Sequence, residues 1–251
     1  MKNILITGIS GKVGSVITAK LKENYNISGV DLKKSNLVST TIADCTNLDK
    51  ILPAFKGIDV VIDLASDPNQ YSDWNVIHDT NLLCTSTALE ASRISGVKRF
   101  IFASSNHATG MYEFDSPYKE IVEGEYSKVN KDNLPLISTE MPIRPDGPYG
   151  IGKAFGEASG RYYSDKYDIS VMCLRIGSLN SESAPTNIRH FATLLTHNDL
   201  ARLITACVEA PMEIRFGIYY GVSNNKWKFW DTSNSYKDLN YQPEDDAELF
   251  R

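Results

Sequence analysis

Short apolar runs recur along the first two thirds of the chain, separated by longer stretches in which polar and apolar residues mix. Several runs are apolar at consecutive positions, which is typical of strands in a parallel sheet that helices cover on both faces. The pattern predicts six strands, at Asn3–Thr7, Ile27–Val30, Thr40–Ala43, Asp59–Leu64, Arg99–Ala103 and Ile169–Arg175.

The stretches between these runs are long enough for helices, which the pattern predicts at Val13–Glu23, Leu48–Phe55, Trp74–Ile94 and Tyr149–Tyr167. Strands that alternate with helices indicate an α/β fold with a doubly wound parallel sheet. From Gly177 onward the alternation fades, and Asn198–Ala210 is the clearest helix. We therefore expect a main domain over residues 1–176 and a small lobe over residues 177–251, integrated into one compact unit.

One long segment interrupts the alternation. Met111–Pro148 holds five prolines with charged residues between them, and it shows neither helical nor strand periodicity. Long loops inside compact domains are usually functional or mobile. We expect a long excursion over residues 111–148 rather than a regular element.

Composition excludes several classes of protein. The net charge of −5 and the lack of any Lys/Arg-rich run argue against a nucleic-acid partner. The four cysteines lie far apart with no Cys-x-x-Cys pair, which argues against a zinc site or disulfides and suits a reducing compartment. No stretch approaches the ~18 apolar residues of a membrane span. We expect a cytoplasmic protein without a metal site or a membrane partner.

A glycine-rich turn follows the first predicted strand directly and opens the first predicted helix. Gly8, Gly11 and Gly14 match the needs of a dinucleotide site, which are a tight turn, close backbone approach to the pyrophosphate and close helix packing. The N-terminus of the helix favours the phosphates. The fold is therefore predicted as Rossmann-type, with these residues at the cofactor: Gly8, Ser10, Gly11, Lys12, Val13 and Gly14.

Two carboxylates follow the next strands. Asp31 ends the second strand, where a carboxylate can accept hydrogen bonds from both ribose hydroxyls and would repel a 2′-phosphate. This position favours NAD over NADP, although Lys33 and Lys34 follow it and partly offset its charge. Asp44 follows the third strand and is the candidate for the adenine amino group.

A tyrosine, a lysine and a serine supply candidate acid–base chemistry. Tyr149 and Lys153 are four residues apart, so they share one helix face. The ammonium of Lys153 favours the phenolate form of Tyr149, which can then act as a general base toward an alcohol. Ser105 follows the fifth strand, at the sheet edge where ligands bind, and its hydroxyl can orient the substrate.

These motifs together resemble the extended short-chain dehydrogenases/reductases, in the NAD-dependent epimerase/dehydratase group. The resemblance covers essentially the whole chain. It implies that Tyr149 is the acid/base, that Lys153 binds the nicotinamide ribose and tunes the tyrosine, and that Ser105 polarises the substrate oxygen. It also implies a homodimer paired through the helices at Trp74–Ile94 and Tyr149–Tyr167. The NAD-binding set then extends to Leu64, Ala65, Asn81, Ser104, Tyr149, Lys153 and Ile176.

Further motifs resemble the uronate dehydrogenases of this group, which oxidise C1 of a free hexuronic acid to a lactone. The matching segments are Ser104–His107, Arg144–Gly147, Leu174–Ser178, Trp230–Asp231 and Tyr241–Glu248. The resemblance implies that Ser105, Asn106, Ser178 and Arg189 hold the substrate together with Tyr149. A guanidinium suits this role because it binds a carboxylate through two parallel hydrogen bonds.

The segment after the fourth strand departs from that subgroup. It carries Asp67 and Pro68 where the subgroup has small residues and a substrate-binding serine. An Asp67 carboxylate directed into the pocket would repel a uronate, and Ser66 is the candidate to contact a substrate hydroxyl instead. His107 also adjoins the substrate, and we expect a hydrogen-bonded structural histidine there rather than a proton carrier.

Two other functions fit the same motifs. A nucleotide-sugar epimerase or dehydratase would use the same three residues but would recycle its bound NAD, so it would release no NADH. A protein that only senses NAD(P) would keep the fold without catalysis, but such proteins commonly lose the tyrosine or the lysine. The leading prediction is therefore NAD-dependent oxidation of a small sugar or sugar acid.

Overall fold

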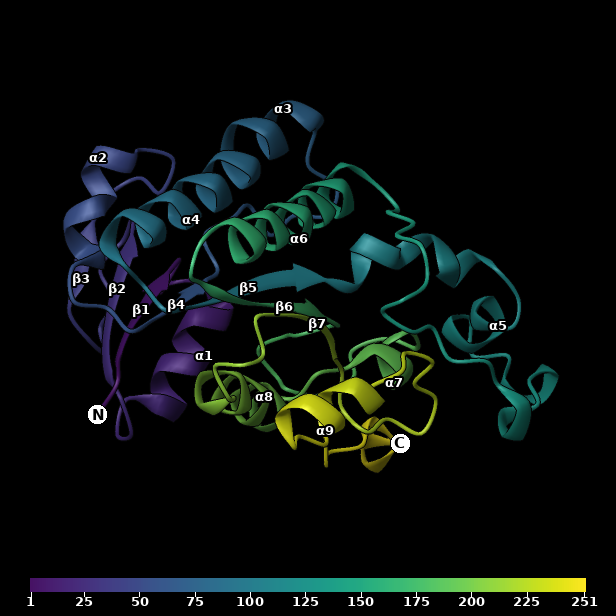
Figure 1. Ribbon diagram of the computed structural model, residues 1–251. Coiled ribbons are helices and arrows are strands. Elements are labelled where there is room, and N and C mark those ends of the chain that lie inside the picture. The colour runs from purple at the N-terminus through teal and green to yellow at the C-terminus, as the bar shows by residue number, and fades with distance from the viewer.

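The computed structural model describes all 251 residues, which form one seven-stranded parallel sheet between two layers of helices (Figure 1). The strands are β1 (Asn3–Thr7), β2 (Asn26–Asp31), β3 (Thr40–Ile42), β4 (Val60–Asp63), β5 (Arg99–Ser105), β6 (Ser170–Ile176) and β7 (Phe216–Gly221). They lie in the order β3-β2-β1-β4-β5-β6-β7, so the chain reverses direction across the sheet after β3. This architecture confirms the predicted Rossmann-type fold.

Helices cover both faces of the sheet. Figure 1 shows α4 (Leu83–Ser95) and α6 (Pro148–Lys166) on one face, and α1 (Lys12–Leu21) and α8 (His197–Glu209) on the other. Successive β1 side chains feed the two cores, since Ile4 and Ile6 pack with α1 and α8 while Leu5 packs with α4. The smaller helices are α2 (Leu48–Ile51), α3 (Trp74–Val76), α5 (Tyr118–Val122), α7 (His190–Thr193) and α9 (Ser233–Leu239). None of the helices combines the length and hydrophobicity that crossing a bilayer requires.

The long helix predicted at Trp74–Ile94 forms with one irregularity. A π-helical turn at Ile77–Leu82 joins α3 to α4, and the helix ends at Gly96 in the left-handed conformation. Such π-helical turns occur often at functional sites. This one carries Asn81, whose side chain holds the loop after β4 as described below.

Strand β7 is absent from the elements predicted from the sequence. This strand pairs in parallel with β6 and forms the edge of the sheet, although it lies after the alternating part of the chain. Gly217 and Gly221 weaken its strand pattern, since glycine is depleted in strands. The residues after Gly177 therefore contribute both an edge strand and helix α8, which packs against α1.

The predicted excursion at 111–148 is an ordered segment with short helical turns, so the expectation of a loop without elements was wrong in part. Two short 3₁₀ turns lie within Asn106–Phe114 and meet at a kink at Thr109, α5 follows, and two further 3₁₀ turns lie at Tyr126–Lys128 and Lys131–Asn133. Each turn is too short to show periodicity in the sequence. Apolar side chains of this segment, among them Tyr112, Tyr118, Ile121 and Ile137, share a core with Phe229 and Trp230.

Candidate active site

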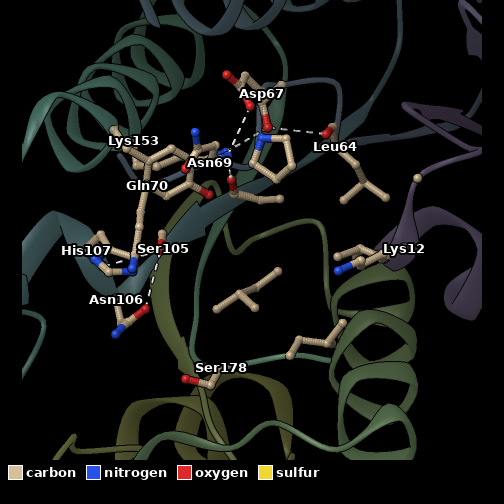
Figure 2. A pocket seen from close by; sticks show the side chains of 18 of the residues that line it. Lys12, Leu64, Asp67, Asn69, Gln70, Ser105, Asn106, His107, Lys153 and Ser178 are labelled. Atoms are coloured by element: carbon tan, nitrogen blue, oxygen red, sulfur yellow. Dashed lines mark hydrogen bonds between the residues drawn. The ribbon is translucent and has the colours of Figure 1, made fainter. Parts of the chain in front are cut away.

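A cavity of about 1740 Å³ lies at the carboxyl ends of the strands. Single small ligands usually occupy roughly 300–1,000 Å³, so this cavity has room for a dinucleotide and a second molecule. Every predicted site residue except Asn81 lines it. Figure 2 shows Lys12 on one side, at the start of α1, and Ser105, His107 and Lys153 on the other.

The glycine turn forms one end of the cavity. Gly8 adopts a φ of +66°, which favours glycine, and a Cβ on it would lie 2.9 Å from the backbone nitrogen of Ala65. A Cβ on Gly14 would lie 2.6 Å from the carbonyl oxygens of Gly8 and Ile9, so α1 can pack against the turn only with glycine there. These contacts supply the tight turn and close packing that a dinucleotide pyrophosphate requires.

Asp31 is fixed beside this turn at the end of β2. Its carboxylate accepts hydrogen bonds from the backbone N–H of Ser10 at 2.9 Å and of Lys33 at 3.0 Å. The Ser10 hydroxyl donates to the Lys33 carbonyl at 2.7 Å, which ties the turn to the β2 end. Asp44 lies along the same side of the cavity, and hydrogen bonds from Thr46 hold the pKa of its carboxyl below the usual value.

The loop after β4 is held from below. The Thr7 hydroxyl accepts hydrogen bonds from the N–H groups of Leu64 and Ala65, both at 3.1 Å, and donates to Asp63 at 2.6 Å. Burial raises the pKa of Asp63 to about 6, against the opposing effects of the Thr7 hydrogen bond and the charge of Lys153. This buried carboxyl ends β4, directly before Leu64 and Ala65, which line the cavity.

Asn81 does not line the cavity, unlike the prediction. Its side-chain oxygen accepts from the N–H of Asp67 at 2.7 Å, and its amide donates to the Asp67 carbonyl at 3.1 Å. The Asp67 carboxylate in turn accepts from the N–H of Asn69 and from the Ser72 hydroxyl, at 3.0 and 2.6 Å. Asn81 thus positions the loop after β4. The Asp67 carboxylate forms its hydrogen bonds within that same loop.

Lys153 is almost fully buried between the two ends of the cavity. Its Nζ donates to the Ala103 carbonyl at 2.8 Å and lies 3.5 Å from the Ser66 hydroxyl. The same Nζ lies 5.4 Å from the centre of the Tyr149 ring, one helical turn earlier on α6. The β5 backbone therefore fixes the lysine next to the phenol, as an acid–base pair requires.

Ser105, at the end of β5, lies beside this pair. Its hydroxyl accepts from the N–H of His107 at 3.2 Å and contacts the Asn106 side-chain oxygen at 3.3 Å (Figure 2). His107 bonds Asp146 through Nδ1 at 2.6 Å, and its ring packs edge-on against Tyr149. His107 is thereby held by hydrogen bonds at the edge of the cavity.

Ser104 and Ile176 support the cavity from the sheet. The Ser104 hydroxyl donates to Glu157 at 2.6 Å, and Glu157 forms a bidentate ion pair with the buried Arg175. Ile176 ends β6 and lines the wall. This buried network fixes the middle of α6 against β5 and β6.

Arg189 lies in the cavity but is already paired. Its Nε and Nη2 donate to the two carboxylate oxygens of Glu113 at 2.6 and 2.7 Å, and its Nη1 donates to the Ser178 hydroxyl at 2.9 Å. Burial disfavours the charged guanidinium, but Glu113 and then Asp146 raise its pKa overall. Sequence reasoning missed Glu113 because it lies in the 111–148 segment. The only sign of Glu113 in the sequence is an acidic residue seven positions after Asn106.

The fold and the site together define a dinucleotide-dependent enzyme of the short-chain dehydrogenase/reductase class. The family model described as "NAD dependent epimerase/dehydratase family" matches residues 4–209. The chain belongs to this family, which confirms the predicted resemblance and the predicted cofactor, NAD.

Individual relatives in this family are sugar and sugar-acid dehydrogenases. The chain is 33% identical to an NAD-dependent glucose-6-phosphate dehydrogenase of Haloferax volcanii, over 98% of this chain and 95% of that protein. It is 32% identical to a uronate dehydrogenase of Agrobacterium fabrum, over 100% of this chain and 88% of that protein. A crystal structure of a mutant uronate dehydrogenase from Agrobacterium tumefaciens complexed with NAD superposes with a TM-score of 0.84. It is 28% identical and covers 100% of this chain and 88% of that one.

Proposed function

We propose that this protein oxidises the C1 hydroxyl of a free sugar, a hexuronic acid or a related small sugar, to the lactone with NAD as the acceptor. The observation that carries the proposal is one cavity in which Tyr149, Lys153 and Ser105 adjoin the glycine turn. The Haloferax and Agrobacterium relatives support it, since their names identify dehydrogenases of a sugar phosphate and of uronates.

The residues present fit the dinucleotide. The turn at Gly8 has a positive φ and packs against the Ala65 backbone, which only glycine allows, and the N-terminus of α1 favours the pyrophosphate. Asp31 would accept the ribose hydroxyls, and Asp44 the adenine amino group. Bound NAD supplies the acceptor for the hydride that leaves C1.

The proton step falls to the chain's own residues. Tyr149 takes the proton of the C1 hydroxyl through its phenolate oxygen, and the C1–O bond becomes the lactone carbonyl. Lys153, anchored on the Ala103 carbonyl, supplies a fixed positive charge that stabilises the phenolate. Ser105 donates a hydrogen bond that aligns the substrate oxygen. Tyr149 then passes the proton to water and returns to the phenolate form.

The remaining predicted residues would hold the sugar. Ser66, Asn106 and Ser178 line the cavity with uncharged hydrogen-bonding groups, and Arg189 adds guanidinium N–H donors. His107, fixed by Asp146, offers the edge of its ring. Such convergent polar groups suit a polyhydroxylated ligand, in which each ring hydroxyl needs a partner.

The test is NADH formation from NAD with a panel of free sugars, hexuronic acids and nucleotide sugars. Tyr149→Phe should lower kcat by about 10²–10⁴-fold because it removes the general base. The matched control, Tyr236→Phe, removes the same hydroxyl from an exposed tyrosine outside the cavity and should leave kcat unchanged.

Conversion of a nucleotide sugar without net NADH would move the protein to the epimerases and overturn the proposal. NAD binding without turnover of any sugar would also overturn the proposal, and it would indicate a non-catalytic NAD sensor.

We further propose a homodimer formed through the helices on the α4 and α6 face of the sheet. Large apolar side chains on these helices are at least one third exposed: Trp74, Val76, Leu83, Ile94, Ile151, Phe155 and Tyr162. A second copy would cover such a face symmetrically, as a two-fold interface requires. Light scattering after size exclusion measures the mass, and a monomer of 28.0 kDa at micromolar concentration would contradict the dimer.

We place the protein in the cytoplasm. All four cysteines are free and buried, at Cys45, Cys84, Cys173 and Cys207, and they form no disulfide. Burial raises the pKa of the Cys45 thiol to about 12, which keeps it protonated and unreactive. These features suit a reducing compartment, and localisation of a tagged full chain would test the assignment.

A further inference from the structure

The cavity has a cofactor half, lined by the glycine turn, Asp31 and Asp44, and a sugar half, lined by Ser105, Asn106, Ser178 and Arg189. A continuous chain of side-chain hydrogen bonds crosses the sugar half. It runs from Ser105 through Asn106 to Glu113, and from Glu113 through Arg189 to Ser178. Glu113 is its centre, because its carboxylate accepts from Asn106 at 3.2 Å and from both ends of the Arg189 fork. Four of these five residues were predicted to hold the substrate, so Glu113 is built into the substrate site itself.

The charge of Arg189 is neutralised by this arrangement. The Glu113 side chain is only 10% exposed, and its two contacts with Arg189 measure 2.6 and 2.7 Å. A guanidinium has five N–H groups, of which Glu113 and Ser178 take three. Two N–H donors remain for a ligand, but no net positive charge remains with them.

No other cationic side chain supplies the positive charge that Glu113 neutralises on Arg189 in the sugar half. Lys12 and Lys33 lie with the glycine turn and the β2 end, on the cofactor side (Figure 2 for Lys12). Lys119 is more than half exposed and lies 4.0 Å from Glu123, with which it forms an ion pair. Lys153 is committed to Ala103 and Tyr149. An anionic group on the sugar would therefore meet the Glu113 carboxylate without a free cation.

We propose that Glu113 sets the substrate class: by occupying Arg189, it makes this end of the cavity a binding site for sugar hydroxyls, and the enzyme prefers uncharged aldoses to hexuronic acids and sugar phosphates. The inference rests on the proposed function and deepens it. A carboxylate and two guanidinium N–H groups accept from and donate to neighbouring ring hydroxyls. A sugar carboxylate would either face Glu113 across a short distance or displace it, leaving a buried carboxylate unpaired.

The experiment compares kcat/KM for matched pairs: galactose with galacturonic acid, glucose with glucuronic acid, and glucose with glucose 6-phosphate. The wild type should favour the uncharged member of each pair by about tenfold or more. Glu113→Gln keeps the shape but removes the charge. It should shift the uronate-to-aldose ratio toward the uronate by about tenfold or more, mainly through a lower KM for the uronate.

Two further variants guard the interpretation. Glu140→Gln removes an exposed carboxylate from the same 111–148 segment that neither lines the cavity nor pairs with a cationic side chain of the cavity, so it should leave the ratio unchanged. Glu113→Asp keeps the charge and should keep the preference for uncharged sugars even where its activity falls. NAD binding, followed by fluorescence titration, identifies any variant that has failed to fold. In that case equilibrium binding of galacturonic acid and galactose to the Tyr149→Phe protein with NAD measures the preference directly.

The outcomes separate the two proposals. Oxidation of sugars with a wild-type preference for either anionic member of a pair would overturn the role of Glu113 and leave the proposed function standing. An unchanged ratio in Glu113→Gln would overturn it as well. Failure to oxidise any sugar would overturn the proposed function itself.

Discussion

The two halves of the cavity are built in different ways. In the cofactor half, backbone groups form most of the contacts, such as the N–H of Gly8 to the Val30 carbonyl and the N–H of Ser10 to Asp31. In the sugar half, side chains from distant segments pair with one another, as Arg189 does with Glu113. The cofactor half is a feature of one turn, whereas the sugar half is assembled from several loops.

This difference decides what each half can tolerate. A backbone site restricts the residue type at fixed spacing, because any Cβ at Gly8 or Gly14 meets backbone atoms. A side-chain site can change its ligand by one substitution while the fold stays the same. We therefore expect the cofactor half to lose binding when its backbone is disturbed, and the sugar half to change specificity, as proposed for Glu113.

The largest expected effect is that of Gly8→Ala. The new Cβ would lie 2.9 Å from the Ala65 nitrogen in a φ region that L residues avoid, so the turn must move away from its dinucleotide-binding shape. Binding of NAD, measured by calorimetry, should weaken by about 100-fold or more, and the free energy of unfolding should fall by about 1–2 kcal/mol.

Gly96→Ala is the matched control. Gly96 has a φ of +73° at the end of α4, but a Cβ there would meet no atom within 4 Å. It should lose a similar amount of stability while NAD binds normally. Equal loss of NAD binding in both variants would show that general strain, rather than the cofactor turn, is responsible.

The same contrast explains how much the sequence reveals. The glycine turn, Asp31 and the Tyr149–Lys153 pair could be predicted, because physical constraints fix residue types at set spacings. The sheet could be predicted where its strands are continuous apolar runs, but β7, with its two glycines, could not. Glu113 and the indirect role of Asn81 could not be predicted either, since their partners Arg189 and Asp67 become neighbours only through tertiary packing.

The next largest effect concerns Asp63, the buried last residue of β4, which accepts a hydrogen bond from Thr7. Burial raises its pKa from 3.8 to about 6, although Thr7 and Lys153 act in the opposite direction. Between these values the folded protein binds more protons than the unfolded chain, so stability falls as the pH rises from about 4 to about 7. At about 1.4 kcal/mol per unit of pKa, the loss is about 2–3 kcal/mol.

Asp63→Asn should remove this pH dependence. Urea denaturation at pH 4 and pH 7 should show the variant gaining about 2 kcal/mol relative to the wild type at the higher pH. Asp59→Asn changes an exposed carboxylate just before β4 and should show no such difference. If the difference in the free energy of unfolding between the wild type and Asp63→Asn were the same at pH 4 and pH 7, the raised pKa of Asp63 would be contradicted.

The smallest expected effect concerns Asp31, a position in the cofactor half where a side chain, and not the backbone, determines which dinucleotide is preferred. Asp31→Asn removes the charge that would repel a 2′-phosphate, while the amide oxygen can still accept from Ser10. The ratio of kcat/KM for NAD over NADP should fall by about tenfold, or 1.4 kcal/mol, and Lys33 nearby keeps the effect small. Asp44→Asn, at the residue proposed to bind the adenine that both dinucleotides share, should weaken the binding of both equally. If Asp44→Asn alone changed the ratio, the cofactor preference would lie outside the β2 end, and the ribose assignment of Asp31 would be wrong.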